Sequence, residues 1–553
     1  MNARPSPALV SQRAVRRLPR IALLLFCAAY ILPGVFGRDP WRHADQTAFG
    51  YMLAIAEGRT SWFAPSIGGL APENAILPHW LGAASIAWLS PWLGAPLAAR
   101  LPFALLLAGV LALTWYTTFQ LARTDAAQPV AFAFGGEAEP VDYARAMADG
   151  ALLALIASLG LLQLGHETTP ELVQLFAAAL TLYACAAAPF RNARAVVAAL
   201  LGLPLLAASG APSMAMFFGL AAAVISARSL YPEVRRFAAW LLAATALAAT
   251  VAWLAGTWGW RVTLDGSAAQ AVRMLRLAAW FLWPVSLLAI WTLWRWRRQM
   301  NKRHIALPLA LAAVAVGASI AGGAFDRALM LGLPAFAVLA AFALPTLQRA
   351  TSAAIDWFSV FFFSIAAVAI WVIYVAMLTG TPARTAANVA KLAPGFQLEW
   401  SPLALLAAGA GSVAWLWLVR WRTGRHRDAL WKSLVLPAGG VALAWLLLMT
   451  LWLPLLDYAR SNRPWVERLA PHIPAGACVW APGYARSSVA ALEQYGRWRV
   501  EANSARTPDC PVMLRQVRRG QTGHAAPPGW RLVTSISRPT DRDEATEVLG
   551  RTD

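Results

Sequence analysis

Charged residues are scarce in this sequence of 553 residues: they make up 13% of it, whereas roughly a quarter of a soluble globular chain is charged. Hydrophobic residues account for 59%. Apolar runs of about 17 to 25 residues recur from residue 21 to residue 457, a length that suits α-helices crossing a hydrocarbon core of roughly 30 Å. Barrel strands would be about ten residues long and would alternate. The composition therefore excludes a soluble enzyme and predicts an all-α polytopic membrane protein.

Acidic residues are fewer than basic ones: 27 Asp and Glu stand against 47 Lys and Arg, which gives a net charge of +20. The arginines lie in short clusters between apolar runs rather than along one soluble face, so we expect no nucleic-acid partner. The first cluster comprises Arg13, Arg16, Arg17 and Arg20. No small-residue cleavage site follows the next apolar run, so we expect a retained span and a cytoplasmic N-terminus over residues 1–20.

Interpreting every apolar run but one as a span gives about thirteen crossings within a membrane domain over residues 21–457. The exception is 75–97, because counting it would place the later arginine clusters outside. Residues 38–100 then form a large external loop with juxtamembrane helices, and residues 123–149, with Gly, Pro and mixed charge, a cytoplasmic loop. The expected spans are 21–37, 101–122, 150–164, 171–188, 194–209, 213–229, 237–256, 277–294, 305–323, 328–347, 354–379, 401–419 and 433–456.

Long apolar runs are absent after about residue 458, where polar residues dominate. The stretches "GACVWAPGY", "PVMLRQV" and "GWRLVTSIS" are typical of short strands, and "SSVAALEQYG" of a helix ended by glycine. We therefore expect a small α/β domain over residues 458–553. An odd number of crossings places it on the outer side.

Cysteine is rare as well, with four residues in the chain. Cys27 and Cys185 lie in apolar runs and are interpreted as small buried hydrophobic residues. Cys478 and Cys510 lie in the polar tail, where an oxidising compartment would allow a disulfide, and the sequence leaves their pairing open. No spacing such as His-x-x-x-His supports a zinc or manganese site, so no metal ligand is predicted.

The stretch "RDPWRHADQTAFGYM", residues 38–52, is unusually rich in ionisable groups for this chain. A carboxylate such as Asp45 at the mouth of a helical bundle can act as a base toward a hydroxyl, and arginines such as Arg38 and Arg42 can hold a phosphate. The alternative is that an interfacial loop carries polar residues simply because it is wet. The clustering favours a functional site.

Several stretches follow Asp45 in a fixed order: "FGYMLAIAEG", "SWFAPSIGG", "PENAILPHWLGA" and "ARLPFALLL", and later "FLWPVSLLAIW" and "DRALMLGLPAFAVLAAFALP". In these stretches the chain resembles the polyprenyl-phosphate-dependent GT-C glycosyltransferases. The branch that it resembles contains the lipid A aminoarabinose transferases and the protein O-mannosyltransferases (PMT family). The resemblance implies the GT-C fold with a small extracytoplasmic tail domain.

The resemblance also implies site residues. Asp45 matches the catalytic aspartate of the first loop, and the second acidic residue falls in "GHETTPELVQLF", where Glu167 and Glu171 are both candidates. Glu171 has an alternative interpretation, since an acid at the start of a helix is favoured by the helix dipole. Asn74 replaces the family's phosphate-contacting lysine. The residues that would supply positive charge to the donor phosphate instead are Arg42, Arg59 and Arg327, and further first-loop candidates are Asp39, His43, Glu73 and His79.

The function that the resemblance implies is transfer of a sugar from a polyprenyl-phosphate-linked donor to a hydroxyl of lipid A, another glycolipid, a polysaccharide or a protein. Transfer would occur at the outer face of the membrane and invert the anomeric carbon. The resemblance fixes no cofactor: arginines or a divalent cation, Mg or Mn, could stabilise the phosphate leaving group, and the sequence leaves this choice open. The Ala, Arg and Trp richness and the resemblance favour a bacterial inner membrane. The alternatives are a noncatalytic flippase or transporter for a lipid-linked sugar and a membrane scaffold.

Overall fold

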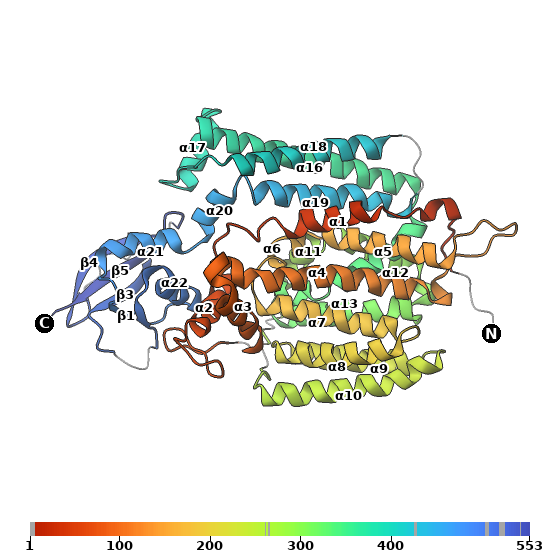
Figure 1. Cartoon of the computed structure of the whole chain (residues 1–553), viewed down its shortest axis with the longest axis horizontal. Helices are drawn as coiled ribbons and strands as arrows, with labels where there is room; N and C mark the ends of the chain where they lie inside the picture. The colour runs from red at the N-terminus through yellow and green to blue at the C-terminus, as the bar shows by residue number, and fades with distance from the viewer. Residues whose placement is uncertain are drawn as a thin grey trace.

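The computed structural model describes residues 6–552 except 42, 74, 260–261, 264–265, 425–428, 504–507, 519–525 and 542. A long helical domain carries a small sheet domain at one end, and the N-terminal segment with the start of α1 lies at the other end (Figure 1). The helices up to the sheet domain are α1 (Arg20–Ile31), α2 (Ala44–Ala56), α3 (Leu77–Leu93), α4 (Ala95–Ala122), α5 (Pro140–Ala157), α6 (Leu159–Leu164), α7 (Pro170–Ala187), α8 (Asn192–Ala208), α9 (Pro212–Ala227), α10 (Pro232–Leu254), α11 (Ala268–Phe281), α12 (Val285–Arg295), α13 (Arg303–Ala321), α14 (Asp326–Met330), α15 (Leu333–Ala343), α16 (Arg349–Thr379), α17 (Ala383–Leu392), α18 (Pro402–Thr423), α19 (Val435–Leu448) and α20 (Leu453–Arg460).

Proline marks where many of these helices begin. It is the first residue of α5, α7, α9, α10 and α18. At that position its missing N–H removes no intrahelical hydrogen bond, and its fixed φ already suits a helix. The local sequence therefore sets the start of each of these helices before any packing is considered.

Seven helices among the described residues are long and apolar enough to cross a membrane, or eight if α11 and α12, which meet at 97°, count as one span. Shorter apolar helices are α1, α8, α9 and the stretch Leu333–Thr346. The all-α polytopic class is therefore confirmed, while the number thirteen stays a prediction. The helix α3, which was expected to lie at the surface, is not among the seven.

The predicted cytoplasmic loop over residues 123–149 is shorter than expected. The helix α5 already begins at Pro140, and Asp149 is buried inside the helical domain. Charge misled the prediction here, because the acids of this segment have partners. Asp142 pairs with Arg17, and Asp149 accepts hydrogen bonds from the Leu18 backbone and from the Trp115 indole.

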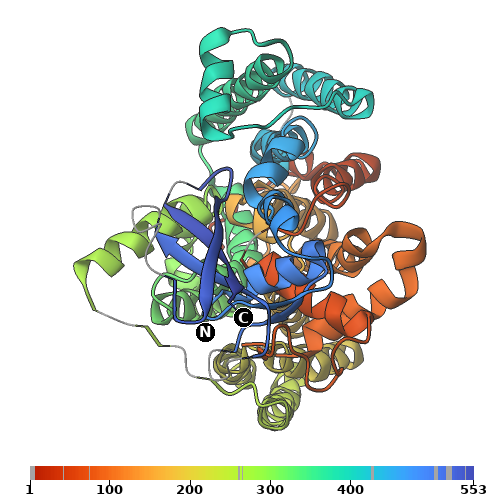
Figure 2. The same ribbon diagram turned by 90° about the vertical axis from the view of Figure 1, so that its left-hand side faces the viewer.

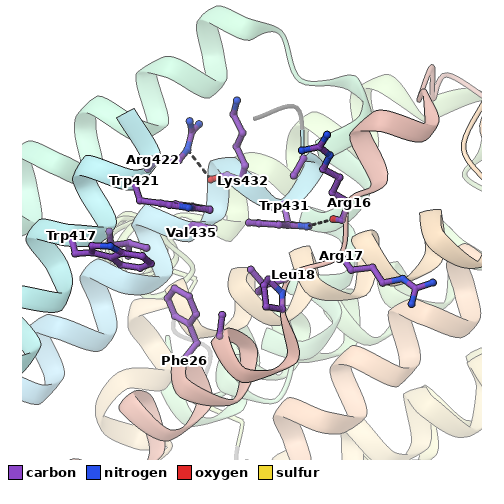
Figure 3. Close-up of a pocket in the computed structure, with 14 residues that line it drawn as sticks. Arg16, Arg17, Leu18, Phe26, Trp417, Trp421, Arg422, Trp431, Lys432 and Val435 are labelled. Carbon is purple, nitrogen blue, oxygen red and sulfur yellow. Dashed lines mark hydrogen bonds between the residues drawn. The ribbon is translucent and has the colours of Figure 1, made fainter. Parts of the chain in front are cut away.

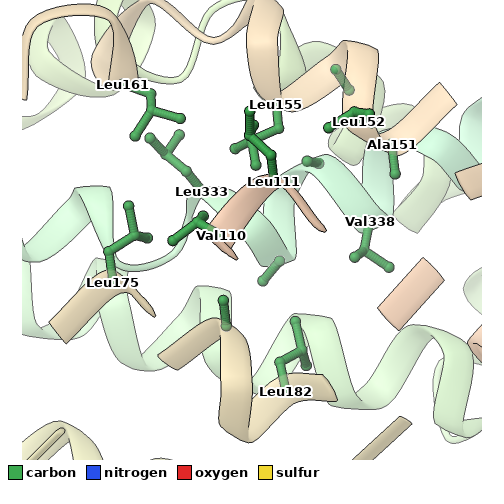
Figure 4. Close-up of a cluster of buried hydrophobic side chains, with 14 of the residues drawn as sticks. Val110, Leu111, Ala151, Leu152, Leu155, Leu161, Leu175, Leu182, Leu333 and Val338 are labelled. Atoms are coloured by element: carbon green, nitrogen blue, oxygen red, sulfur yellow. The ribbon is translucent and has the colours of Figure 1, made fainter. Parts of the chain in front are cut away.

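The core of the helical domain is built around α5 and α15, which are buried along almost their whole length. Side chains of α4, α5, α7 and α15 meet there, among them Val110, Leu155, Leu175 and Val338 (Figure 4). α15 and the second half of α5 are apolar on every face, which suits them to central positions. These central helices support the loops at the ends of the domain.

The tail domain is a five-stranded mixed sheet with two helices. Its strands are β1 (Cys478–Trp480), β2 (Arg499–Glu501), β3 (Val512–Arg518), β4 (Trp530–Ser537) and β5 (Glu544–Arg551), and its helices are α21 (Arg463–Leu469) and α22 (Arg486–Gly496). The strand order is β2-β1-β3-β5-β4. β1 runs parallel to β2 and β3, and β5 pairs antiparallel with β3 and β4. The predicted small α/β domain is confirmed.

A disulfide joins Cys478 of β1 to Cys510, two residues before the start of β3. Cys185 is buried and Cys27 is partly buried in the helical domain, and neither forms a disulfide. The pairing that the sequence left open is therefore formed in the structure.

The first loop and the tail domain share one hydrophobic core, and Figure 2 looks onto this end of the molecule. Tyr51 and Ala54 of α2 pack in the same cluster as Val489 of α22. Gly50 allows the close approach, since a Cβ at this position would lie 2.4 Å from the Cβ of Ala490. The sheet domain is therefore docked on the loop that carries the candidate site.

Candidate active site

Asp45, in the first turn of α2, is held by donors from two loops. Its Oδ1 accepts hydrogen bonds from the backbone N and the Oγ1 of Thr168 at 2.8 and 2.9 Å. Its Oδ2 accepts from the backbone N of Trp41 at 3.1 Å and from Nη2 of Arg38 at 3.3 Å. The same Nη2 donates to the carbonyl of His166 at 2.6 Å. The carboxylate therefore ties the first loop to the segment between α6 and α7.

The surroundings of Asp45 keep its carboxylate ionised. Burial alone would raise the pKa of Asp45, but the charges of Arg38 and Arg100 and the backbone N–H groups of Thr168 and Trp41 lower it below its ordinary value. The N-terminal end of α2 adds a favourable field. With both oxygens occupied by donors, this carboxylate is suited to orienting other groups rather than to taking up a proton.

Glu167, one residue before Thr168, forms a second buried cluster. Its Oε2 accepts from Nη2 of Arg327 at 2.6 Å, and its Oε1 accepts from Nε2 of Gln163 at 2.9 Å. Nη1 of Arg327 lies 3.2 Å from Oγ1 of Thr169 and 3.6 Å from Oε2 of Glu171. Both acidic candidates of the second loop are therefore brought to Arg327, and Glu167 makes the closer contact.

Glu167 differs electrostatically from Asp45. Burial raises the pKa of Glu167 above its ordinary value, the nearby charge of Asp45 adds to the rise, and Arg327 opposes it without cancelling it. Burial alone would lower the pKa of Arg327, but Glu167 and Glu171 raise it. Two carboxylates on neighbouring loops are thus pushed in opposite directions, which is how an acid–base site separates an orienting group from a proton acceptor.

Trp41 connects this site to the start of the tail domain. Its Nε1 donates to Oδ1 of Asp457 at 2.8 Å, and the guanidinium groups of Arg38 and Arg460 lie 4.8 and 4.9 Å from its ring centre. Arg460 also donates to Oε1 of Gln163 at 2.6 Å, which joins it to the Glu167 cluster. Burial raises the pKa of Asp457 to about 6. The segment after the last span therefore closes one side of the site.

Several buried guanidinium nitrogens at this site have no hydrogen-bond partner among the described residues. They are Nε and Nη1 of Arg38 and Nε of Arg100. Both arginines are buried, and the positive charges of both act on Asp45. A buried donor without a partner costs about 1 to 3 kcal/mol, and more when it is charged. Such an arrangement is suited to an anion that supplies the missing acceptors.

Two of the predicted phosphate-binding and first-loop candidates lie away from Asp45. Arg59 follows the far end of α2, roughly 20 Å along the helix axis from Asp45 at 1.5 Å per residue, and it pairs with Glu57 and with Glu493 of the tail domain. Glu73 pairs with Arg486, also of the tail domain. Arg59 and Glu73 therefore lie in the contact between the first loop and the sheet domain and not beside Asp45.

The remaining candidates of the first loop differ in how close they lie to the site around Asp45. Asp39 pairs with Arg463 at 2.6 Å, and its backbone N donates to Asp457, so it borders the site. His43 precedes α2 with φ of 76° and accepts a hydrogen bond from Thr47 through its carbonyl. His79 is buried against the ring of Tyr51, and burial lowers its pKa to about 4. Arg42 and Asn74 lie outside the described residues.

The described residues around Asp45 and Glu167 offer no set of metal ligands. In the described part of the chain, no three His, Cys, Asp or Glu side chains come close enough together to hold a metal ion. Asp45 and Glu167 are each bonded to arginine instead.

Sequence reasoning missed Thr168, Gln163, Asp457 and Arg460. Asp457 follows directly after a predicted span, at the side expected to be external, where an acidic side chain is a candidate for a site at the membrane surface. That signal would have found it. Thr168 and Gln163 carried no signal, because uncharged polar side chains near a span end are common in any membrane protein.

Comparison with known proteins gives a fold but no sequence family. A scan against protein-family models and a search of curated proteins found no match. Among solved structures, the chain is similar to the crystal structure of ArnT from Cupriavidus metallidurans bound to undecaprenyl phosphate, with a TM-score of 0.62, 13% identity and coverage of 96% of this chain and 97% of that chain. The apo structure of the same protein gives 0.58 and 12%, with 96% of each chain covered. The protein therefore has the GT-C membrane fold of ArnT, as the resemblance in its sequence implied.

Proposed function

We propose that this protein is a glycosyltransferase that moves a sugar from a polyprenyl-phosphate-linked donor to a hydroxyl acceptor at the outer face of a bacterial inner membrane. One observation carries the proposal: Thr168, the residue after Glu167, donates to Asp45, which brings the two acidic residues near each other beside arginines whose N–H groups lack some partners among the described residues. The fold adds support, because one of the similar ArnT structures binds undecaprenyl phosphate.

The arginines would hold the donor phosphate. Arg38 and Arg100 offer the buried donors that lack partners, and Arg327 adds a third guanidinium that is partly exposed. Guanidinium groups bind phosphate oxygens in pairs of charge-assisted hydrogen bonds. A phosphate leaving group needs no proton, so fixed positive charges placed where its negative charge develops are sufficient to stabilise it.

Glu167 would be the general base. Its raised pKa makes it the stronger base of the two carboxylates, whereas the lowered pKa of Asp45 and its four donors make Asp45 an orienting group. When Arg327 turns to the donor phosphate, Oε2 of Glu167 is released to accept the proton of the acceptor hydroxyl. General base catalysis of this kind contributes typically about 10² to 10⁴-fold to the rate.

The proposed reaction is a single displacement at the anomeric carbon. The acceptor oxygen attacks the anomeric carbon, its proton passes to Glu167, and the bond from the anomeric carbon to the phosphate oxygen breaks with its electron pair on that oxygen. Direct attack from the face opposite the phosphate inverts the anomeric carbon, as in single-displacement glycosyl transfer. Polyprenyl phosphate leaves, with its charge held by Arg38, Arg100 and Arg327.

The membrane setting suits a lipid-linked donor. Ionisable groups near membrane depth face polar cavities or pair with one another, as these do. With the N-terminus cytoplasmic, the site and the tail domain lie on the periplasmic side. Acceptors that fit this position are lipid A, another glycolipid, a surface polysaccharide and a protein hydroxyl.

The test is transfer of radiolabel from polyprenyl-phosphate sugars to extracted membrane lipids and proteins. The wild type is compared with Glu167→Gln and with Glu171→Gln as the matched control. We expect transfer by the wild type, a loss in Glu167→Gln and a smaller change in Glu171→Gln. Label that crosses the membrane without joining an acceptor would support the flippase instead, and neither transfer nor crossing would support the scaffold.

A further inference from the structure

A second charged region lies at the end of the helical domain opposite the sheet. A cavity of about 480 Å³ opens there between α1, α18 and the turn η5 (Leu430–Leu434), directly before α19 (Figure 3). Its rim carries the side chains of Arg16, Arg17, Arg422 and Lys432. None of these residues takes part in the site around Asp45.

The rim has an excess of positive charge. Arg17 pairs with Asp142, and Arg422 pairs with Asp356 and donates to the carbonyl of Lys432. Among the described residues, the four rim cations outnumber these two carboxylates by two, and the charges of both Arg422 and Lys432 act on Asp356. The side chain of Arg16 is exposed, while its carbonyl accepts from the indole of Trp431 and so fixes the backbone at the rim.

The walls of the cavity change from tryptophan side chains to other apolar side chains away from the rim. Trp421 and Trp431 lie with their rings nearly parallel, 6.4 Å apart, and Trp417 stacks on the other side of Trp421 at the same spacing. Beyond them the lining continues to Phe26 and Leu418. Tryptophan prefers the headgroup level of a membrane, and aliphatic walls suit hydrocarbon, so the cavity matches a molecule with both parts.

The neighbouring helix faces are suited to contact with lipid. Leu24 and Leu25 of α1 and Leu416 of α18 are largely exposed in the protein alone, at 67%, 63% and 67%. The two helices that border the cavity therefore also present aliphatic side chains suited to the hydrocarbon of the bilayer. A soluble anion would fill the cationic rim but would leave the apolar part of the cavity without a partner.

We propose that this cavity is a binding site for an anionic glycerophospholipid of the adjacent leaflet. The headgroup phosphate lies between Arg16 and Lys432, and one acyl chain follows Phe26 and Leu418 between α1 and α18. Basic pockets between membrane helices are suited to anionic lipid headgroups, since each lysine or arginine near such a surface contributes about fivefold to the affinity. The proposal is independent of glycosyl transfer.

The experiment counts lipid bound to the full-length protein, purified in a neutral detergent, by native mass spectrometry during titration with phosphatidylglycerol or phosphatidylcholine. We expect the wild type to prefer phosphatidylglycerol. The variant Arg16→Gln with Lys432→Gln should bind it about 25-fold more weakly, from about fivefold per removed cation. The matched control, Arg13→Gln with Arg20→Gln, removes two charges of the same segment that do not line the cavity and should remain within twofold of the wild type.

Three results would overturn the proposal. Equal loss in both double variants would show diffuse surface charge, and unchanged binding in Arg16→Gln with Lys432→Gln would show that the cavity binds no anionic lipid. Full displacement of the lipid by free glycerol 3-phosphate would show a site for phosphate alone. If the double variant does not fold, Arg16→Gln alone, at an exposed side chain, should still weaken binding about fivefold.

Discussion

The two ends of the helical domain both gather arginine and tryptophan, but they hold their charges differently. At the sheet end, the side chains of Arg38 and Asp45 are 0% and 2% exposed, and each belongs to a network that crosses several elements. At the opposite end, the side chains of Arg17 and Asp142 are 61% and 23% exposed. The first arrangement holds its charges in fixed positions, as the proposed active site requires, whereas the second leaves its charges in contact with the surroundings of the protein.

Buried and exposed ion pairs also differ in how much the loss of one partner lowers the stability of the protein. Breaking a buried ion pair by removing one partner typically costs about 3 to 5 kcal/mol, because the remaining charge stays buried without compensation. An exposed pair contributes about 0 to 1 kcal/mol. The largely buried pair of Arg422 and Asp356 shows that the opposite end is not free of such pairs, but the network that crosses several elements around Asp45 supports the proposed active site at the sheet end.

The largest effect is expected from removing one charge of the buried pair. Asp45→Asn leaves Arg38 without its carboxylate, and we expect the free energy of unfolding in detergent to fall by about 3 to 5 kcal/mol. Asp142→Asn, at the exposed pair of the other end, should change it by less than about 1 kcal/mol. Thermal and denaturant unfolding measure both. Similar losses in the two variants would remove the distinction between the ends.

The next effect concerns the two acids that share Arg327. Glu167→Gln should lower kcat by about 10² to 10⁴-fold, because it removes the proposed base. In the wild type, kcat/KM should fall as the pH drops through the pKa of Glu167, which burial raises, since the protonated acid accepts no proton. In Glu167→Gln this fall should be absent. A pH profile unchanged by the substitution would assign the base elsewhere.

A smaller effect should follow from separating the first loop from the sheet domain. Gly50→Ala places a methyl group 2.4 Å from the Cβ of Ala490, and overpacking of this kind costs about 1 to 3 kcal/mol. Gly409→Ala, on α18 with no atom within 4 Å of the added carbon, is the matched control. Limited proteolysis between α20 and β1 should become faster only in Gly50→Ala. Equal rates would mean that the contact between α2 and α22 does not hold the sheet domain.

The smallest effect concerns Asp457. Its pKa is raised by burial to about 6, so the stabilisation from its protonated form is present below about pH 4 and is lost as the pH rises through 6. The variant Asp457→Asn is neutral throughout. Its free energy of unfolding should therefore gain on the order of 1 to 2 kcal/mol relative to the wild type between pH 4 and pH 7. A difference that does not change with pH would contradict the raised pKa.

The sequence predicted the elements of the tail unevenly. β1, β3, β4 and α22 were expected from apolar alternation and a terminal glycine, and the structure confirms them. β2 has three residues and β5 reads "EATEVLGR", so neither resembles a buried strand. Their places are set by tertiary pairing: Glu547 of β5 is buried because it faces Arg515 across the sheet.

The candidate site was also predicted in part. Asp45, Glu167, Glu171 and Arg327 come together in the structure, because each lies near a helix end on the same side of the helical domain. Arg59 did not join them, since the length of α2 separates it from Asp45. Two residues of one loop can be close in sequence and still lie at different places in the fold. The docking of α2 against the sheet domain decides where each of them lies.

The most direct test of the account is one assay of label transfer from a polyprenyl-phosphate sugar with three purified proteins at equal folded amounts: the wild type, Asp45→Asn and Asp142→Asn. The account predicts transfer by the wild type and by Asp142→Asn, and loss of transfer in folded Asp45→Asn. Transfer that survives in Asp45→Asn, or that is lost equally in both variants, would contradict the assignment of the active site to the sheet end.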